Sequence, residues 1–173
     1  MYHDEFTTHH GEAPRCSVAE NLGNTDKGIL MKARIKWIEG AALLGEAESG
    51  HTVMLDGPPE SGGRNRGLRP MEMILLGLGG CTASDVVAIL NKSRQAVTDC
   101  VVELQASRAQ APPKVFTHIH INYIITGHNL QHTKVKRAID LSTEKYCSAT
   151  IMLRQAVTIT HEYRLIESAS SPA

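Results

Sequence analysis

One apolar segment organises the rest of this sequence: Met71-Glu-Met-Ile-Leu-Leu-Gly-Leu-Gly-Gly-Cys81-Thr-Ala-Ser-Asp85. Pro70 stands immediately before it, and proline suits the first position of a helix because its missing N–H would have no partner there. Apolar residues continue at helical spacing, so we expect one long helix from Pro70 to about Lys92. A helix that is apolar on most sides is typically buried at the centre of a domain.

Small side chains form a continuous stripe along this predicted helix. They are Gly77, Gly80, Cys81, Ser84 and Ala88, which share one helical face. Each glycine inside a helix destabilises it by about 1 kcal/mol relative to alanine, so another interaction must offset that loss. Close approach of a second backbone would do so. We expect either the second predicted helix or the same helix of a partner subunit at this stripe, with Cys81 sunk into the seam.

A second cysteine lies in Glu144-Lys-Tyr-Cys147-Ser-Ala-Thr150, at the end of a second predicted helix from about Thr133 to Cys147. Its predicted buried face is formed by Val135, Ala138, Ile139 and Ser142. Two thiols on helices, in a chain without a recognisable secretion signal, are more often reactive than structural. Thiol redox chemistry at Cys81 and Cys147 is therefore the leading hypothesis.

Composition narrows the class of protein. Lysine plus arginine equals aspartate plus glutamate at 18 each, so the chain lacks the basic character of a nucleic-acid-binding protein. The apolar stretch Met73 to Ala83 is too short to span a bilayer. Asp4 and Glu5 stand where a signal peptide needs positive charge. We expect a soluble, cytoplasmic protein that binds neither nucleic acid nor membrane.

The remaining candidate ligands and thiols have simpler interpretations. Cys100 alternates with Val102 and Leu104 on one strand face, which predicts a core position, and Cys16 lies in a polar stretch. His118 and His120 share the outward face of a predicted strand. Because neither Cys-x-x-Cys nor a zinc-type cysteine and histidine spacing occurs, we expect no metal and no cofactor.

The remaining periodicity predicts an α+β fold. Residues 1–30 show no periodicity and are expected to be a disordered extension, residues 31–168 a single domain, and residues 169–173 a frayed end. Strands are predicted at Lys32–Ile38, Ala41–Gly45, His51–Leu55, Thr98–Gln110, Val115–Thr126 and Val157–Ile166. The order is three strands, a helix, two strands, helices and a strand, with mostly antiparallel pairing.

Two quoted segments resemble a known family. Arg69-Pro-Met-Glu-Met-Ile-Leu-Leu-Gly-Leu-Gly-Gly-Cys81 is similar to the cysteine helix of the OsmC/Ohr proteins, and Glu144-Lys-Tyr-Cys147-Ser-Ala149 falls where their second cysteine does. The resemblance implies an intertwined homodimer in which a mostly antiparallel sheet wraps a long central cysteine-bearing helix. It also implies that Cys81 attacks a small-molecule peroxide, that Cys147 resolves the resulting sulfenic acid, and that an unidentified dithiol reductant restores the pair.

The sequence departs from the family pattern near the expected activating residues. In the peroxidases, a glutamate close to the helix-opening proline holds an arginine over the thiolate, whereas here Met71 follows Pro70 and the carboxylate comes at Glu72. The family's Gly-Gly-Arg triplet recurs only in the loop before the helix, at Gly62-Gly-Arg64. Arg64, Arg66 and Arg69 are therefore the candidates for the positive charge that would activate the Cys81 thiolate. The alternative hypothesis is a redox-silent or redox-sensing dimer that binds an apolar small molecule without turnover.

Overall fold

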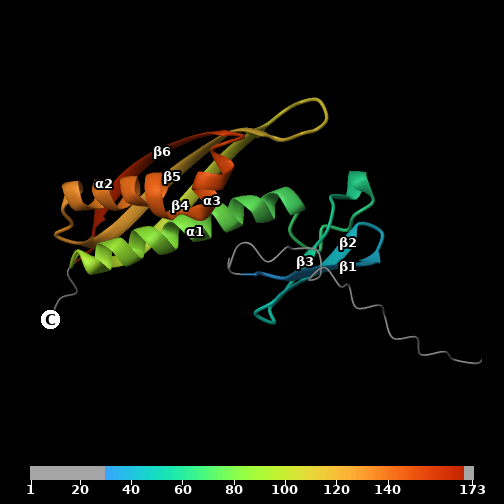
Figure 1. Cartoon of the computed structure of the whole chain (residues 1–173), viewed down its shortest axis with the longest axis horizontal. Helices are drawn as coiled ribbons and strands as arrows, with labels where there is room; N and C mark the ends of the chain where they lie inside the picture. Colours follow the sequence, from blue (N-terminus) through green and yellow to red (C-terminus); the bar gives the residue numbers. More distant parts are fainter. Residues whose placement is uncertain (1–29, 170–173) are drawn as a thin grey trace, which may run out of the picture.

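The computed structural model describes residues 30–169, which form two parts that meet near the start of one long helix (Figure 1). The elements are β1 (Ala33–Glu39), β2 (Ala42–Ala47), β3 (Thr52–Leu55), η2 (Pro59–Ser61), α1 (Pro70–Lys92), β4 (Ala96–Arg108), β5 (Phe116–His128), α2 (His132–Leu141), η3 (Ser142–Tyr146), α3 (Ser148–Leu153) and β6 (Thr158–Glu167). This order confirms the predicted α+β fold. The predicted extension and frayed end fall almost entirely outside the described residues, as does Cys16.

The first part is an antiparallel three-stranded sheet with the order β1-β2-β3, which we call the N-terminal meander. Trp37 of β1 pairs with Leu43 of β2, and Leu44 pairs with Met54 of β3. Every residue of β1 is exposed, and Trp37 retains 67% of its accessible surface. The meander therefore presents apolar side chains that the described part of its own chain does not cover.

The second part is a separate three-stranded sheet with the order β4-β5-β6. β4 and β5 are antiparallel, whereas β5 and β6 are parallel, with Ile121 opposite His161 and Ile125 opposite Leu165. The parallel pair follows from the connection, because the helices between β5 and β6 return the chain to the end of the sheet where β5 began. The six strands are thus mostly antiparallel, as predicted, but they form two sheets.

The core lies between this second sheet and the helices. Alternate residues of β5 are buried on the helix side, whereas His118 and His120 lie on the opposite side and are partly exposed. The outward placement predicted for the two histidines is therefore correct. The buried cluster comprises Leu78, Val86, Leu90, Phe116, Ile119, Ile121, Tyr123, Ile125, Val135, Ala138, Ile139, Cys147 and Val157. Cys100 is half-buried and packs against this cluster.

The second predicted helix is interrupted before its cysteine. α2 ends at Leu141, and the chain continues as a wider π-helical turn, η3. Within this turn the Thr143 hydroxyl donates hydrogen bonds to the carbonyls of Ile139 and Asp140, so a side chain competes for the carbonyls that would continue the helix. Cys147 is extended, with φ −69° and ψ 99°, and is the N-cap of α3. The prediction that Cys147 lies within a helix was wrong.

The predicted helix from Pro70 to Lys92 is confirmed, and of the two partners expected at its small-residue stripe, the second predicted helix does not lie against Gly77 or Gly80. Gly79 faces β4, where an added Cβ would lie 2.8 Å from Leu104 Cδ1. Gly77 and Gly80 of the small-residue stripe are exposed, and an added Cβ at either would meet nothing within 4 Å. Neither α2 nor any other described element packs there, so within one chain the stripe remains open at these two glycines.

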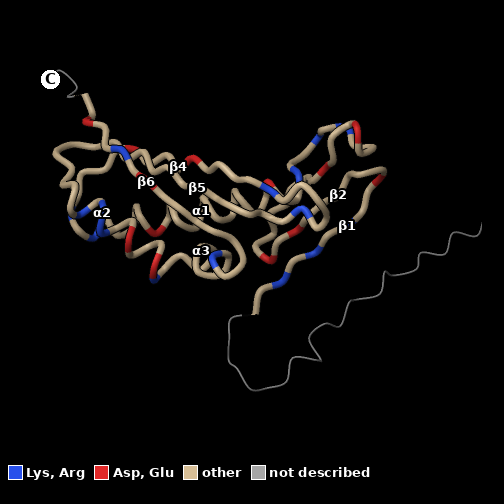
Figure 2. Tube along the Cα trace, turned by 90° about the horizontal axis from the view of Figure 1, so that it is seen from above, with Lys and Arg blue, Asp and Glu red and all other residues tan. Residues whose placement is uncertain are grey.

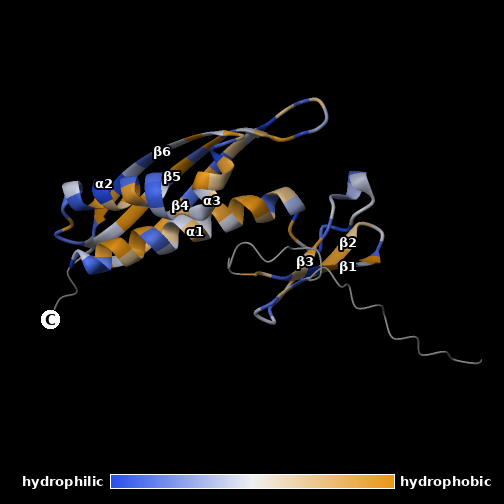
Figure 3. Ribbon diagram, viewed as in Figure 1, coloured by the Kyte–Doolittle hydropathy of each residue, from blue (hydrophilic) through white to orange (hydrophobic). Residues whose placement is uncertain are grey.

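The apolar character of α1 extends over most of its length (Figure 3). The sequence predicted an apolar stretch too short for a bilayer, but the helix has 23 residues and is long and apolar enough, by length and composition alone, to cross one. One side of α1 packs against β4, α2 and α3, as expected of the central helix of this fold. Acidic and basic residues occur along both parts of the molecule (Figure 2).

Candidate functional site

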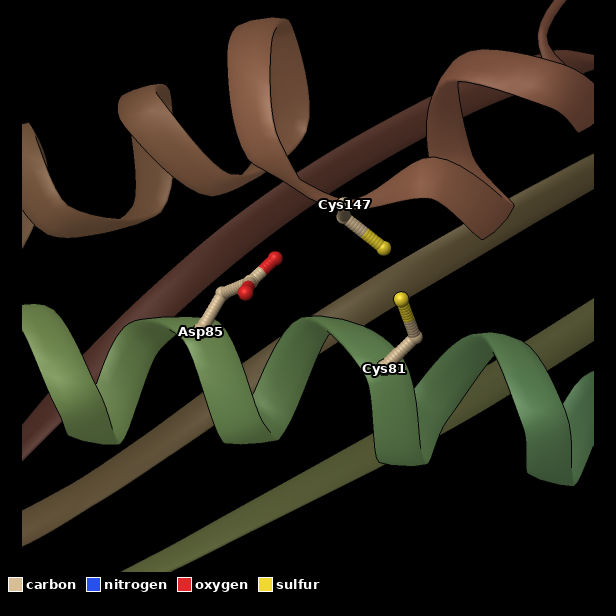
Figure 4. Close-up of side chains that lie close together, drawn as sticks. All are labelled: Cys81, Asp85 and Cys147. Atoms are coloured by element: carbon tan, nitrogen blue, oxygen red, sulfur yellow. The ribbon is translucent and has the colours of Figure 1, made fainter. Parts of the chain in front are cut away.

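The fold brings the two predicted cysteines together. Cys81 projects from the middle of α1 toward Cys147, which lies in the connection between η3 and α3 (Figure 4). Asp85, one turn after Cys81 on α1, points to the same place. The two sulfur atoms and a carboxylate oxygen of Asp85 all lie within 4.8 Å of one another. Both thiols are free.

The two thiols have different surroundings. Cys147 is fully buried, whereas Cys81 is partly exposed. Burial raises the pKa of the Cys147 thiol, a hydrogen bond from Thr150 lowers it in part, and the neighbouring Cys81 raises it further. This bond runs from the Thr150 backbone N–H to Cys147 Sγ at 3.4 Å. Cys147 is thus held as a protonated thiol at neutral pH, while Cys81 is the thiol that a solute can approach.

A hydrogen-bonded series of buried hydroxyl groups lies next to the two cysteines and Asp85. The Thr82 hydroxyl lies 2.6 Å from the Tyr123 hydroxyl and 3.0 Å from that of Ser142, and Ser142 in turn donates to Asp85 Oδ2 at 3.4 Å. This series ties α1 to β5 and η3 at the level of the cysteines. Burial raises the pKa of Tyr123 to about 12, although its bond to Thr82 opposes the shift. Tyr123 therefore remains a neutral hydrogen-bonding phenol.

Sequence reasoning missed the residues around the cysteines. Asp85 had a usable signal, since it follows Cys81 by four residues and so shares its helical face. Thr82, Tyr123 and Ser142 had none, because their hydroxyl groups meet across 41 and 60 residues of sequence. The tertiary structure alone brings them into contact.

The three candidate arginines bind carboxylates of the same chain. Arg64 and Arg66 both pair with Glu39, at 3.2 and 2.7 Å. Arg69 pairs with Glu72 at 2.8 Å. Glu72 precedes Cys81 by nine residues, or about 14 Å along a helix, so the Arg69–Glu72 pair does not reach the thiols of its own chain.

Two other features bear on binding. A cavity of about 550 Å³ lies between the N-terminal meander and the start of α1, with Leu55, Leu75 and Phe116 among its lining residues; neither cysteine lines it. His118 and His120 share Thr160 Oγ1 as a hydrogen-bond partner, at 3.0 and 2.8 Å. These contacts fit the interpretation of the two histidines as the polar side of a strand.

Taken together, the architecture defines an α+β protein built around a cysteine-bearing central helix, with a second thiol packed against the first. The OsmC family model, described as OsmC-like protein, matches residues 62–162. Protein YhfA of Escherichia coli (strain K12) is 50% identical over 136 residues, which cover 79% of this chain and 98% of YhfA. The chain belongs to the OsmC family.

Solved structures share this fold. A hypothetical protein from Aquifex aeolicus VF5 has a TM-score of 0.72 and 27% sequence identity, covering 82% of this chain and 99% of that one. An organic hydroperoxide resistance protein OsmC from Legionella pneumophila has a TM-score of 0.60 at 18% identity, covering 78% of this chain and 96% of its own. At that identity the Legionella protein supports the fold alone.

Proposed function

We propose that this protein is a thiol-dependent reductase of organic hydroperoxides, with Cys81 as the peroxidatic residue and Cys147 as the resolving residue. The observation that carries the proposal is the approach of the two sulfur atoms to within 4.8 Å. Membership of the OsmC family supports a redox or peroxide-related role. We further propose that the protein is cytoplasmic, where its thiols would start reduced.

The exposure of the two thiols supports the assignment of roles. The Cys81 thiolate attacks the terminal oxygen of the hydroperoxide, the O–O bond breaks, and the departing alkoxide takes a proton to leave as the alcohol. Cys81 then carries a sulfenic acid. The buried Cys147 attacks this sulfur, its thiol proton leaves with the sulfenic oxygen as water, and a disulfide forms. An external dithiol reductant of unidentified nature returns both cysteines to thiols.

We also propose that two copies form the intertwined homodimer implied by the family resemblance. The exposed apolar residues of β1 and of α1 support it, since Trp37, Met73, Ile74 and Leu76 all remain open in one chain. Burying them against a second copy removes this apolar surface from water. The open small-residue stripe at Gly77 and Gly80 would admit a second α1 helix.

Such a dimer would also place an arginine of the partner subunit beside Cys81. If two α1 helices pack antiparallel and cross near Gly77, Cys81 of one copy lies opposite about residue 73 of the other. The Arg69–Glu72 pair of the partner subunit would then lie beside Cys81. A guanidinium there would favour the thiolate over the thiol.

Intact mass spectrometry tests the chemistry. The reduced, metal-free protein is treated with one equivalent of cumene hydroperoxide, alongside the Cys81→Ser, Cys147→Ser and Cys100→Ser variants. We expect loss of two hydrogens in the wild type and in the Cys100→Ser control, one added oxygen in Cys147→Ser, and no change in Cys81→Ser. An unmodified wild-type mass would overturn the reductase proposal.

Sedimentation tests the dimer. Gly80→Lys adds a charge where the single chain leaves open space, and Ala156→Lys adds the same charge to an exposed turn away from the stripe. We expect a dimeric wild type, a dimeric Ala156→Lys control and a mainly monomeric Gly80→Lys variant. A monomeric wild type, or a Gly80→Lys variant that remains fully dimeric, would contradict this packing.

The cavity between the N-terminal meander and α1 favours a second candidate function, which is the binding of an apolar small molecule without turnover. It is lined by apolar side chains that include Leu43, Leu55, Leu75 and Phe116, and it lies apart from the thiols. Calorimetric titration with decanol tests this function. Saturable binding that Leu75→Arg abolishes, together with an unmodified mass after hydroperoxide treatment, would establish it in place of the reductase.

A further inference from the structure

We propose that the reduced protein binds one thiophilic divalent cation of the zinc class through Cys81, Cys147 and Asp85. No cysteine spacing along the sequence indicated such a site, because its ligands come from two segments that meet only in the folded chain. The inference goes beyond hydroperoxide reduction and does not depend on it.

The geometry of the three side chains fits a cation after a small contraction. Their ligand atoms lie within 4.8 Å of one another. Tetrahedral zinc, with bonds of about 2.3 Å to sulfur and about 2.0 Å to oxygen, needs ligand atoms about 3.5–3.8 Å apart. A contraction of about 1 Å is within the range of a rotation about the side-chain bonds. Cys81 and Asp85 occupy i and i+4 on α1, the spacing with which one helix presents two ligands to one metal.

Neighbouring groups already orient these ligands. The Ser142 hydroxyl donates to Asp85 Oδ2 at 3.4 Å, and Ser142 is itself held by Thr82. The Thr150 backbone N–H donates to Cys147 Sγ at 3.4 Å. The Thr150 hydroxyl, 97% buried beside the same sulfur, makes no hydrogen bond to the described residues and can donate to a metal-bound thiolate. Hydrogen bonds to the ligands are a general feature of metal sites in proteins.

Charge explains why Asp85 suits a metal better than it suits a thiolate nucleophile. The Asp85 carboxylate lies within 4.8 Å of both sulfur atoms, and like charges at that distance repel one another. A divalent cation reverses this effect, because it is attracted to the carboxylate and stabilises both thiolates. The structure places this carboxylate against the thiols while the loop arginines are engaged with other carboxylates of the chain.

The donor set selects the kind of metal. The two sulfur ligands are too soft for magnesium or calcium, which take oxygen ligands. The carboxylate, in turn, is a poor ligand for monovalent copper. Zinc accepts this mixture. Because Cys81 is partly exposed, water can occupy a fourth position.

Metal binding and disulfide formation would exclude each other, because each uses both sulfur atoms. Oxidation of the loaded site by a hydroperoxide balances when two protons are taken up: the products are a disulfide, an alcohol, water and the free divalent cation. Where the proposed function also holds, zinc would protect the dithiol and oxidation would release the zinc.

Titration of the reduced, metal-free full chain with Co²⁺, followed by displacement with Zn²⁺, tests the site without any peroxide. We expect one equivalent of Co²⁺ to produce sulfur-to-cobalt charge-transfer absorption that Zn²⁺ abolishes. Zinc competition against a chromophoric chelator then gives the affinity. Asp85→Asn should weaken zinc binding at least about tenfold, and Ser142→Ala by about tenfold through the loss of its bond to Asp85.

Matched variants separate this site from other ligands in the chain. Cys81→Ser should abolish the charge-transfer band, and it alters a partly exposed residue rather than the buried Cys147. Cys100→Ser and Cys16→Ser should leave both the band and the zinc affinity unchanged. Absence of the band in the wild type, its persistence in Cys81→Ser, or unchanged zinc affinity in Asp85→Asn would each overturn the proposal. Because this titration needs no hydroperoxide and the mass experiment needs no metal, either proposal can fail without the other.

Discussion

The hydrogen bonds among the buried hydroxyl groups of Thr82, Tyr123 and Ser142 allow a quantitative prediction for the substitution Thr82→Val. Valine has nearly the shape of threonine but cannot form hydrogen bonds. Thr82 is fully buried, and its hydroxyl bonds Tyr123 at 2.6 Å and Ser142 at 3.0 Å. The substitution therefore removes one hydroxyl and leaves the Tyr123 hydroxyl without that partner.

The expected loss of stability depends on which hydrogen bonds Ser142 and Tyr123 retain in the Thr82→Val variant. Ser142 retains its contact with Asp85 at 3.4 Å, whereas the Tyr123 hydroxyl, in a fully buried side chain, has no other hydrogen bond to the described residues. A buried polar group left unpaired costs about 1–3 kcal/mol. We therefore expect Thr82→Val to lower the free energy of unfolding by about 2 kcal/mol and Tyr123→Phe to lower it by about 1 kcal/mol.

A double-mutant cycle identifies the cause. In Thr82→Val/Tyr123→Phe no unpaired phenol remains, so the loss should be about 2 kcal/mol rather than the sum of about 3, which gives a coupling of about 1 kcal/mol. Urea unfolding of the reduced protein at one fixed concentration measures all four free energies. The exposed Thr158→Val serves as the control and should change stability by less than about 0.5 kcal/mol. Strict additivity, or a Thr82→Val effect as small as that of the control, would refute this reasoning.

Three further predictions concern oxidation, acid and helix packing. A Cys81–Cys147 disulfide would close a loop of 66 residues (147 − 81), so the oxidised protein should be about 4 kcal/mol more stable to urea than the reduced one; equal stabilities would argue against a native bond. The Arg66 backbone N–H, followed by those of Arg64 and Gly57, lowers the pKa of buried Asp56. Its contribution to stability should therefore be present above the unfolded pKa of about 4 and be lost as pH falls through the lower folded pKa, and Asp56→Asn should flatten the acid limb of a stability profile between about pH 2.5 and 6. Gly79→Val, which places atoms against Leu104 Cδ1, should destabilise the protein in urea unfolding. A Gly→Ala change at the exposed Gly77 or Gly80 of a single chain would instead stabilise α1 by about 1 kcal/mol. A neutral Gly79→Val would show that the Leu104 side chain can rotate away.

Local chemistry was enough to predict much of this protein. Pro70 and the helical spacing after it specify α1 from Pro70 to Lys92, and the buried face of α2 at Val135, Ala138 and Ile139 follows from the same period. The two cysteines were recognisable from their immediate surroundings. These features depend on interactions over three or four residues, which a sequence displays directly.

Tertiary contacts decided the rest. The π-helical turn that ends α2 places Cys147 at the N-cap of α3, and the crossover through these helices makes β6 parallel to β5. The meeting of Asp85 with two sulfurs, and of Thr82 with Tyr123 and Ser142, joins residues that lie far apart along the chain. No local period encodes such contacts, because their geometry depends on how α1 packs against β4, α2 and α3. The two thiols could therefore be identified from the sequence, whereas the groups that surround them, and so their chemistry, depend on tertiary packing.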